Sequence, residues 1–100
     1  MKAIIIETFG GPEVLKLADI PEPTPGADEV LVDIHAASVN PADCRMRDGA
    51  RQNLSGTKFP VRLGRDFSGI VKSVGTGVSD LKVGDAVFGV TEQGKDGTYA

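Results

Sequence analysis

The sequence predicts a small, mainly β protein, a partly open β-barrel with one or two short helices. Apolar residues occur in short segments, several of which alternate with polar residues at the period of a strand. Glycine and proline, 13 and 6 of the 100 residues, separate these segments. One stretch carries both the start and the stop signals of a helix. Because 100 residues is about the length of one domain, we expect residues 1–100 to form a single domain.

The first quarter of the chain contains two predicted strands and an extended connection. Residues 2–8 are largely apolar and are closed by a turn containing two glycines and a proline. Residues 14–20 form a second, alternating segment. Residues 21–26 place prolines at alternate positions, where the backbone has no N–H to donate. We expect an extended surface connection there.

The clearest strand signal, at residues 29–39, leads into the predicted helix. Asn40 is a favoured N-cap residue, and the proline that follows it suits the first helical position. Gly49 supplies a stop signal, so the predicted helix covers residues 41–48. A helix of about two turns is stable only when it docks on the rest of the protein.

The remaining predicted strands cover residues 67–74 and 86–90. Residues 97–100 look like the beginning of a further strand, and an unpaired strand there would expose a sheet edge. We therefore expect the chain to be a fragment of a longer protein.

Composition argues against several classes of function. The chain has 11 Lys and Arg against 14 Asp and Glu, and its basic residues are scattered, which argues against nucleic-acid binding. The apolar start at residues 3–6 is too short for a membrane span or a secretory signal. The single cysteine, Cys44, excludes an internal disulfide and is expected to be a small buried residue. We expect a cytoplasmic protein without nucleic-acid or membrane partners.

Three regions together carry a family resemblance: residues 29–43, 63–71 and 74–89. In order and spacing they resemble the N-terminal GroES-like catalytic domain of the medium-chain dehydrogenase/reductase superfamily. The resemblance covers nearly the whole chain and implies a GroES-like, partly open β-barrel.

Two departures from the zinc alcohol dehydrogenases of that superfamily are informative. Those enzymes have a metal-binding Cys where this chain has Asn40, and a Gly-His-Glu where it has Gly64, Arg65 and Asp66. A guanidinium has no lone pair for zinc, and a catalytic zinc needs three protein ligands. The chain therefore resembles the zinc-independent quinone oxidoreductase (zeta-crystallin-like) branch, and we expect no metal site.

The resemblance implies an NAD(P)H-dependent oxidoreductase that transfers hydride to a quinone or an α,β-unsaturated carbonyl. It implies NADP(H) as the cofactor, bound mainly by a Rossmann domain that is absent from residues 1–100. The whole protein is expected to be a homodimer, and residues 1–100 alone are expected to be inactive.

The candidate site residues lie on or beside the predicted helix. We expect Asn40 and Arg45 to be catalytic, and Asn40 and Asp43 to contact the cofactor, by resemblance. Each has a structural alternative: Asn40 as the N-cap, Asp43 as a partner of the helix dipole, and Arg45 as a solvated surface group. Arg65 and Asp66 are expected to form an ion pair or hydrogen bonds that close the position of the missing metal; alternatively, Arg65 orients the substrate.

Two other functions stay open from the sequence. One is a non-catalytic, co-chaperonin-like barrel module that uses the loop at residues 49–60. The other is a zinc alcohol dehydrogenase with atypical ligands, for which His35, Asp43, Cys44 and Asp66 would have to converge.

Overall fold

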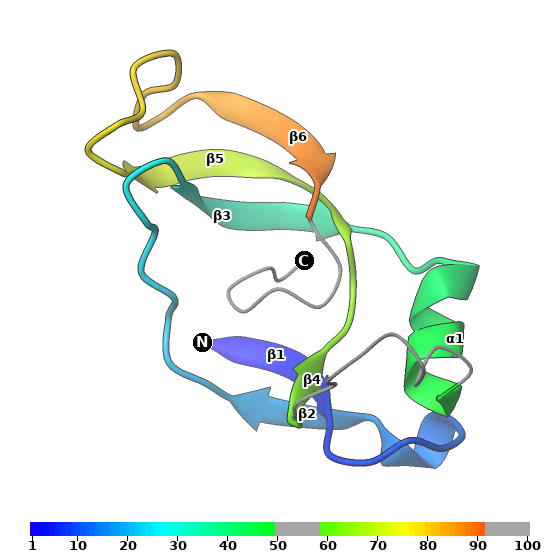
Figure 1. Ribbon diagram of the computed structural model, residues 1–100. Helices are drawn as coiled ribbons and strands as arrows, with labels where there is room; N and C mark the ends of the chain where they lie inside the picture. Colours follow the sequence, from blue (N-terminus) through cyan, green and yellow to red (C-terminus); the bar gives the residue numbers. More distant parts are fainter. Residues whose placement is uncertain (50–58, 92–100) are drawn as a thin grey trace.

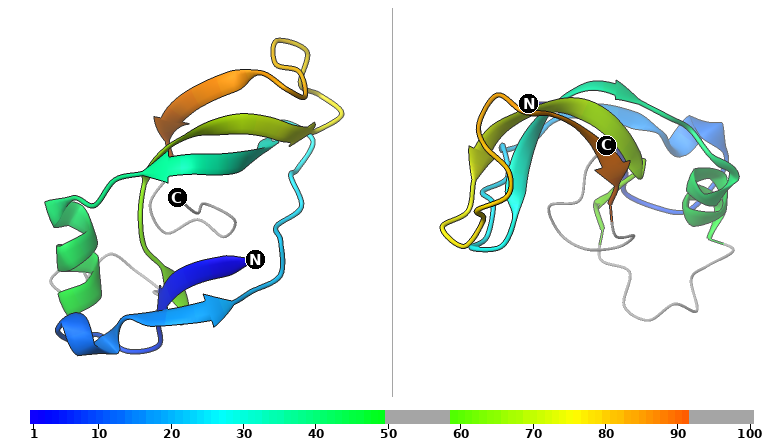
Figure 2. Two further views of the ribbon diagram at one scale, coloured as in Figure 1. Left: turned by 180° about the vertical axis from the view of Figure 1, so that it is seen from behind. Right: turned by 90° about the horizontal axis from the view of Figure 1, so that it is seen from above.

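The computed structural model describes residues 1–49 and 59–91. These residues form two three-stranded sheets with the strand orders β2-β1-β4 and β3-β5-β6 (Figure 1). Every strand is antiparallel to the strands with which it pairs. The described residues contain one α-helix, α1, which stands beside the ends of both sheets (Figure 2). The prediction of a mainly β, partly open barrel is confirmed.

The first sheet contains β1 (Lys2–Ile6), β2 (Lys16–Asp19) and β4 (Val61–Arg62). A short 3-10 helix, η1 (Pro12–Val14), precedes β2. The predicted second strand therefore began too early, because a proline at the start of a helical turn favours η1 over an extended chain.

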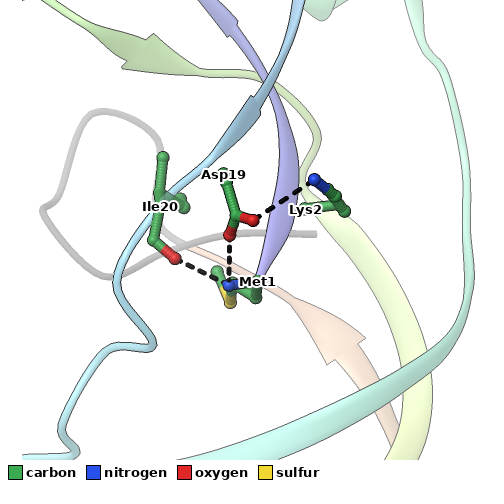
Figure 3. A network of polar contacts seen from close by, with 4 residues as sticks. All are labelled: Met1, Lys2, Asp19 and Ile20. Atoms are coloured by element: carbon green, nitrogen blue, oxygen red, sulfur yellow. Dashed lines mark hydrogen bonds and ion pairs between the residues drawn. The ribbon is translucent and has the colours of Figure 1, made fainter.

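The chain start is held against the end of β2 by a small polar network (Figure 3). The Met1 amine donates hydrogen bonds to the Asp19 carboxylate at 3.0 Å and to the Ile20 carbonyl at 2.7 Å. Lys2 donates to the other Asp19 oxygen at 3.2 Å. The hydrogen bond from the amine, and then that from Lys2, hold the pKa of Asp19 below its usual value.

The second sheet contains β3 (Val30–Ala37), β5 (Asp66–Val74) and β6 (Ala86–Val90). The register between β3 and β5 shifts between Ile34 and Ala36, so His35 has no partner on β5. The simple alternation predicted for this strand is interrupted there.

Helix α1 (Pro41–Asp48) has the predicted bounds, and its last turn is docked. Gly49 has a φ of 87°, which favours glycine. A Cβ at this position would lie 3.0 Å from the Phe9 ring. Gly10 and Arg47 exchange two hydrogen bonds, from Gly10 N to the Arg47 carbonyl at 2.9 Å and from Arg47 Nε to the Gly10 carbonyl at 3.2 Å. These contacts fix the direction of the helix.

The described residues enclose a small apolar core between the sheets. Ile5, Ile6 and Val71 are the buried apolar side chains among them. A cavity of about 520 Å³ is lined by the start of the chain and β1, by residues of β3, and by Glu22, Pro23, Phe67, Lys72 and Thr91. None of the described helices has the length and apolar character that crossing a membrane requires. Residues 50–58 of the loop at 49–60, and the predicted strand start at 97–100, lie outside the described residues.

Candidate functional site

The end of β3, the start of α1, the start of β5 and the end of β6 meet at one edge of the second sheet (Figure 1). Pairing brings them together, because Ala37 lies opposite Phe67 and Asp66 lies opposite Val90. The segment between β3 and α1 therefore passes beside the first residue of β5. This edge holds the positions that the sequence singles out.

Three polar side chains at this edge form a compact triangle. Ser38 Oγ donates to Asp66 Oδ2 at 2.5 Å, and Asn40 Nδ2 donates to the same carboxylate oxygen at 2.6 Å. Asn40 Nδ2 also lies 2.9 Å from Ser38 Oγ, which accepts from it. Asn40 is half-buried. The expectation that hydrogen bonds close this position agrees with the geometry.

The Asn40 amide nitrogen carries two N–H groups and faces two acceptor oxygens in the triangle. A carboxylate only accepts hydrogen bonds, so the NH₂ end of the amide must face Asp66. The two acceptor oxygens are only 2.5 Å apart, so a single N–H can serve both. The two N–H groups of the planar amide diverge, so this arrangement allows one N–H to serve both oxygens while the other points away from them. In that arrangement Asn40 can donate its other N–H to a bound molecule.

The triangle also keeps Asp66 ionised. The hydrogen bond from Ser38 lowers the pKa of Asp66 most, the bond from Asn40 lowers it next, and the charge of Arg65 adds to the effect. Because the pKa is depressed in the folded state, this carboxylate stabilises the fold at neutral pH. That contribution is lost as the pH falls through the depressed value.

A carboxyl titration followed by NMR tests this directly. We expect the Asp66 carboxyl to titrate below the usual range for aspartate, and the Ser38→Ala variant to move its pKa upward, because the strongest hydrogen bond is then absent. Asp66 titrating at the same pH in both proteins would mean that Ser38 does not hold the carboxylate.

Asp43 joins the start of α1 to the segment before β5. Its side chain is 8% exposed, and its two oxygens accept from backbone N–H groups, Oδ2 from Asn40 at 2.8 Å and Oδ1 from Gly64 at 3.0 Å. Gly64 has a φ of 102°, a conformation that other residues rarely adopt. Both carboxylate oxygens thus bind backbone N–H groups of this chain, and in this geometry Asp43 stabilises the fold.

Removing the Asp43 carboxylate should destabilise the protein strongly. We expect Asp43→Ala to lower the free energy of unfolding by about 2–3 kcal/mol, because two part-buried N–H groups lose a charged acceptor. Urea denaturation measures this, and Asp80→Ala, at an exposed turn position, should change stability by less than about 0.5 kcal/mol. Equal midpoints for the two variants would contradict the bridging role.

Arg65 lies next to this cluster without forming the expected ion pair. Its Nε donates to the Thr91 carbonyl at 3.4 Å, and its own carbonyl accepts from Thr91 N at 2.8 Å. No ion pair joins it to Asp66 within the part of the chain that the structure describes. Arg65 thus extends the pairing of β5 with β6, and the carboxylate is held by Ser38 and Asn40 instead.

Other singled-out residues lie outside the triangle. Arg45 is exposed on α1. Cys44 is exposed as well, so the expectation that it is buried was wrong: α1 turns Asp43 inward and its neighbour outward. His35 is exposed on β3, 3.9 Å from Asp33. Among residues 1–49 and 59–91, no three potential ligands come together, so the atypical zinc set does not converge there.

Three exposed apolar side chains lie next to the members of the triangle in the sequence or in the sheet. Val39 is 86% exposed, and Val90, opposite Asp66 in the sheet, is 62% exposed. Phe88 is 88% exposed and lies opposite Ser68. Residues opposite each other in antiparallel strands share a face, so Val90 and Phe88 lie on the same face as Asp66.

Sequence reasoning missed Ser38 as a member of the site. The sequence does carry a signal for Ser38. In an extended chain, residues 38 and 40 are two positions apart, so their side chains lie on the same side. The Asp66 partner that makes Ser38 informative comes from the pairing of β3 with β5.

Comparison with known proteins gives a consistent result. Residues 26–100 match the family described as alcohol dehydrogenase GroES-like domain. The chain is 45% identical over 89 residues to a quinone oxidoreductase of Rattus norvegicus, covering 88% of this chain and 26% of that protein.

Solved structures agree with this match. The quinone oxidoreductase of Coxiella burnetii superposes with a TM-score of 0.84 at 42% identity, covering 90% of this chain and 29% of that one. The Escherichia coli quinone oxidoreductase complexed with NADPH gives a TM-score of 0.81 at 33% identity, covering 88% and 26%. The chain thus spans less than a third of the length of these relatives.

Proposed function

Because this chain belongs to the alcohol dehydrogenase GroES-like domain family, in the quinone oxidoreductase branch of the medium-chain dehydrogenases/reductases, we propose that it forms the substrate-side domain of an NAD(P)H-dependent oxidoreductase. The proposed reaction moves a hydride from the nicotinamide to a quinone or an α,β-unsaturated carbonyl. The electron pair arrives at the substrate, and negative charge develops on its oxygen.

The Asn40 amide, held by Asp66 and Ser38, is the observation that carries this proposal, in which its second N–H faces the substrate. An oxyanion needs a donor already in place, and a donor held by other hydrogen bonds needs no rearrangement during the reaction. Asn40 meets this condition, because Asp66 and Ser38 hold its amide at 2.6 and 2.9 Å. In this proposal the amide stabilises the substrate oxygen without a metal ion.

The apolar surroundings support the same role. Phe88 and Val90 are exposed on the face of the sheet that carries Asp66, where a second domain or a flat substrate would cover them. Excluding water there would strengthen the hydrogen bond from Asn40, since electrostatic interactions grow in a medium of low dielectric constant.

The described residues contain no glycine-rich turn that opens an α-helix, as a dinucleotide fingerprint would require. The sequence Gly75-Thr76-Gly77 resembles the start of a dinucleotide fingerprint, but it lies between β5 and β6 and does not open a helix. A Cβ at Gly75 would lie 2.0 Å from the Gly26 carbonyl oxygen, so close packing accounts for this glycine. We propose that NADP(H) binds mainly to a Rossmann domain of the whole protein and that Asn40 contacts its nicotinamide.

The other site residues have supporting roles in this proposal. Asp43 holds the start of α1 in place, because its carboxylate accepts hydrogen bonds from the backbone N–H groups of Asn40 and Gly64. Arg45, exposed on α1, is a second candidate for a contact with the substrate carbonyl or a cofactor phosphate. We propose a cytoplasmic, homodimeric whole protein whose partners are small-molecule quinones or enones.

Oxidation of NADPH by the whole protein tests the proposed function. We expect turnover with a panel of quinones and α,β-unsaturated carbonyls, and none with the 100-residue chain alone, because half of the cofactor site is missing from it. Absence of turnover with the whole protein across the panel would refute the proposal, as would turnover by the 100-residue chain.

A further inference from the structure

We propose that Asp66 is a positioning residue, which fixes the Asn40 amide in the single orientation that leaves an N–H for the substrate. This inference rests on the proposed function. It assigns a function to the Asp66 carboxylate, which stands where zinc alcohol dehydrogenases have the Glu of their Gly-His-Glu.

The geometry excludes the alternative orientation of the amide. An asparagine amide has two orientations that differ by half a turn and exchange its oxygen with its nitrogen. The other orientation would place Asn40 Oδ1 at the point now 2.6 Å from Asp66 Oδ2, where two acceptors would repel each other. Asp66 therefore selects one orientation by charge.

Asp66 can do this because it is itself held in place. It is the first residue of β5 and lies opposite Val90 of β6. Ser38 donates to the same oxygen that accepts from Asn40. The carboxylate thus has a fixed backbone and a fixed side-chain oxygen, which a positioning residue requires.

Asp66 acts through Asn40 and not on the substrate. A carboxylate beside a developing oxyanion would oppose it, since like charges repel, so direct contact would slow the reaction. In this proposal the donor to the substrate is the second N–H of Asn40. Removing the Asp66 carboxylate should therefore lower kcat only in a protein that still has Asn40.

A double-mutant cycle in the whole protein tests this dependence. The variants are Asn40→Ala, Asp66→Ala, the double variant and Asp66→Asn, and kcat and KM are measured with NADPH and one quinone. We expect Asp66→Ala to lower kcat at least about tenfold with little change in KM, because the donor loses its alignment. We expect no further loss from Asp66→Ala in the Asn40→Ala background, since both changes remove the same interaction.

Asp66→Asn provides the conservative rescue. Its amide oxygen can accept from both Ser38 and Asn40, so we expect activity between those of wild type and Asp66→Ala. Losses that multiply in the double variant would overturn the proposal. So would a rate for Asp66→Asn no better than that for Asp66→Ala.

A neutron crystal structure of the Asp66→Ala protein, which distinguishes the amide oxygen from the amide nitrogen, separates this proposal from the proposed function. We expect the Asn40 amide to adopt a second orientation there; an unchanged amide would overturn the positioning role. If the wild-type protein oxidises no NADPH with any quinone or enone, the proposed function fails, and the orientation of Asn40 in that crystal structure alone supports or overturns the positioning role.

Discussion

Replacing Asn40 with alanine in the whole protein should lower kcat/KM for quinone reduction by about 10²–10³-fold, the usual effect of removing one donor from an oxyanion site. The loss should fall mainly on kcat, because the N–H binds the developing oxyanion more strongly than the neutral carbonyl. Steady-state kinetics with NADPH measure this.

The matched control for this substitution is Thr76→Ala. Thr76 is an exposed turn residue between β5 and β6 and belongs to no part of the proposed site. Its replacement should leave kcat/KM within about twofold, corresponding to a change well below 1 kcal/mol. Similar kinetics for Asn40→Ala and Thr76→Ala would show that Asn40 does not stabilise the transition state.

Gly69→Ala should have a large effect on stability, at least about 3 kcal/mol, because overpacking against backbone leaves no side chain that can move aside. A Cβ at Gly69 would lie 2.1 Å from the carbonyl oxygen of Asp33 on the neighbouring strand and 2.9 Å from Val32 Cγ1. Strands β3 and β5 would have to separate where they pair. Urea denaturation followed by circular dichroism measures the loss.

Gly89→Ala, on the adjacent strand β6, is the control for this steric argument. A Cβ there would meet the Phe67 ring at 3.3 and 3.4 Å, and the ring can shift by a few tenths of an ångström. We expect a loss below about 1 kcal/mol. If both variants unfold at the same urea concentration, close packing of β3 on β5 is not what requires Gly69.

Local signals explain which parts of the fold could be predicted. Helix α1 was predicted with its observed bounds, because Asn40, the proline after it and Gly49 are start and stop signals that act within a few residues. Strand β4 (Val61–Arg62) was not predicted, since two residues carry no periodicity and its pairing partner, β1, is distant in sequence.

The site could be predicted only in part for the same reason. Asn40 and Asp43 belong to a helix start, which the sequence marks clearly. The contact of Asn40 with Asp66 depends on the register of β3 against β5, which shifts at a bulge that periodicity cannot reveal. The expected contact of Asp43 with the cofactor stays a prediction, and the structure adds that both of its oxygens bind backbone groups.

The rate of quinone reduction before and after complete removal of zinc tests the central claim most directly. That claim is that a hydrogen-bond donor, held by a carboxylate, stabilises the substrate oxygen in place of a metal ion. We predict that the whole protein, treated with a chelator and shown by elemental analysis to hold far less than one zinc per chain, keeps its full kcat. A rate that falls in proportion to the zinc removed, and returns when zinc is added back, would contradict the account.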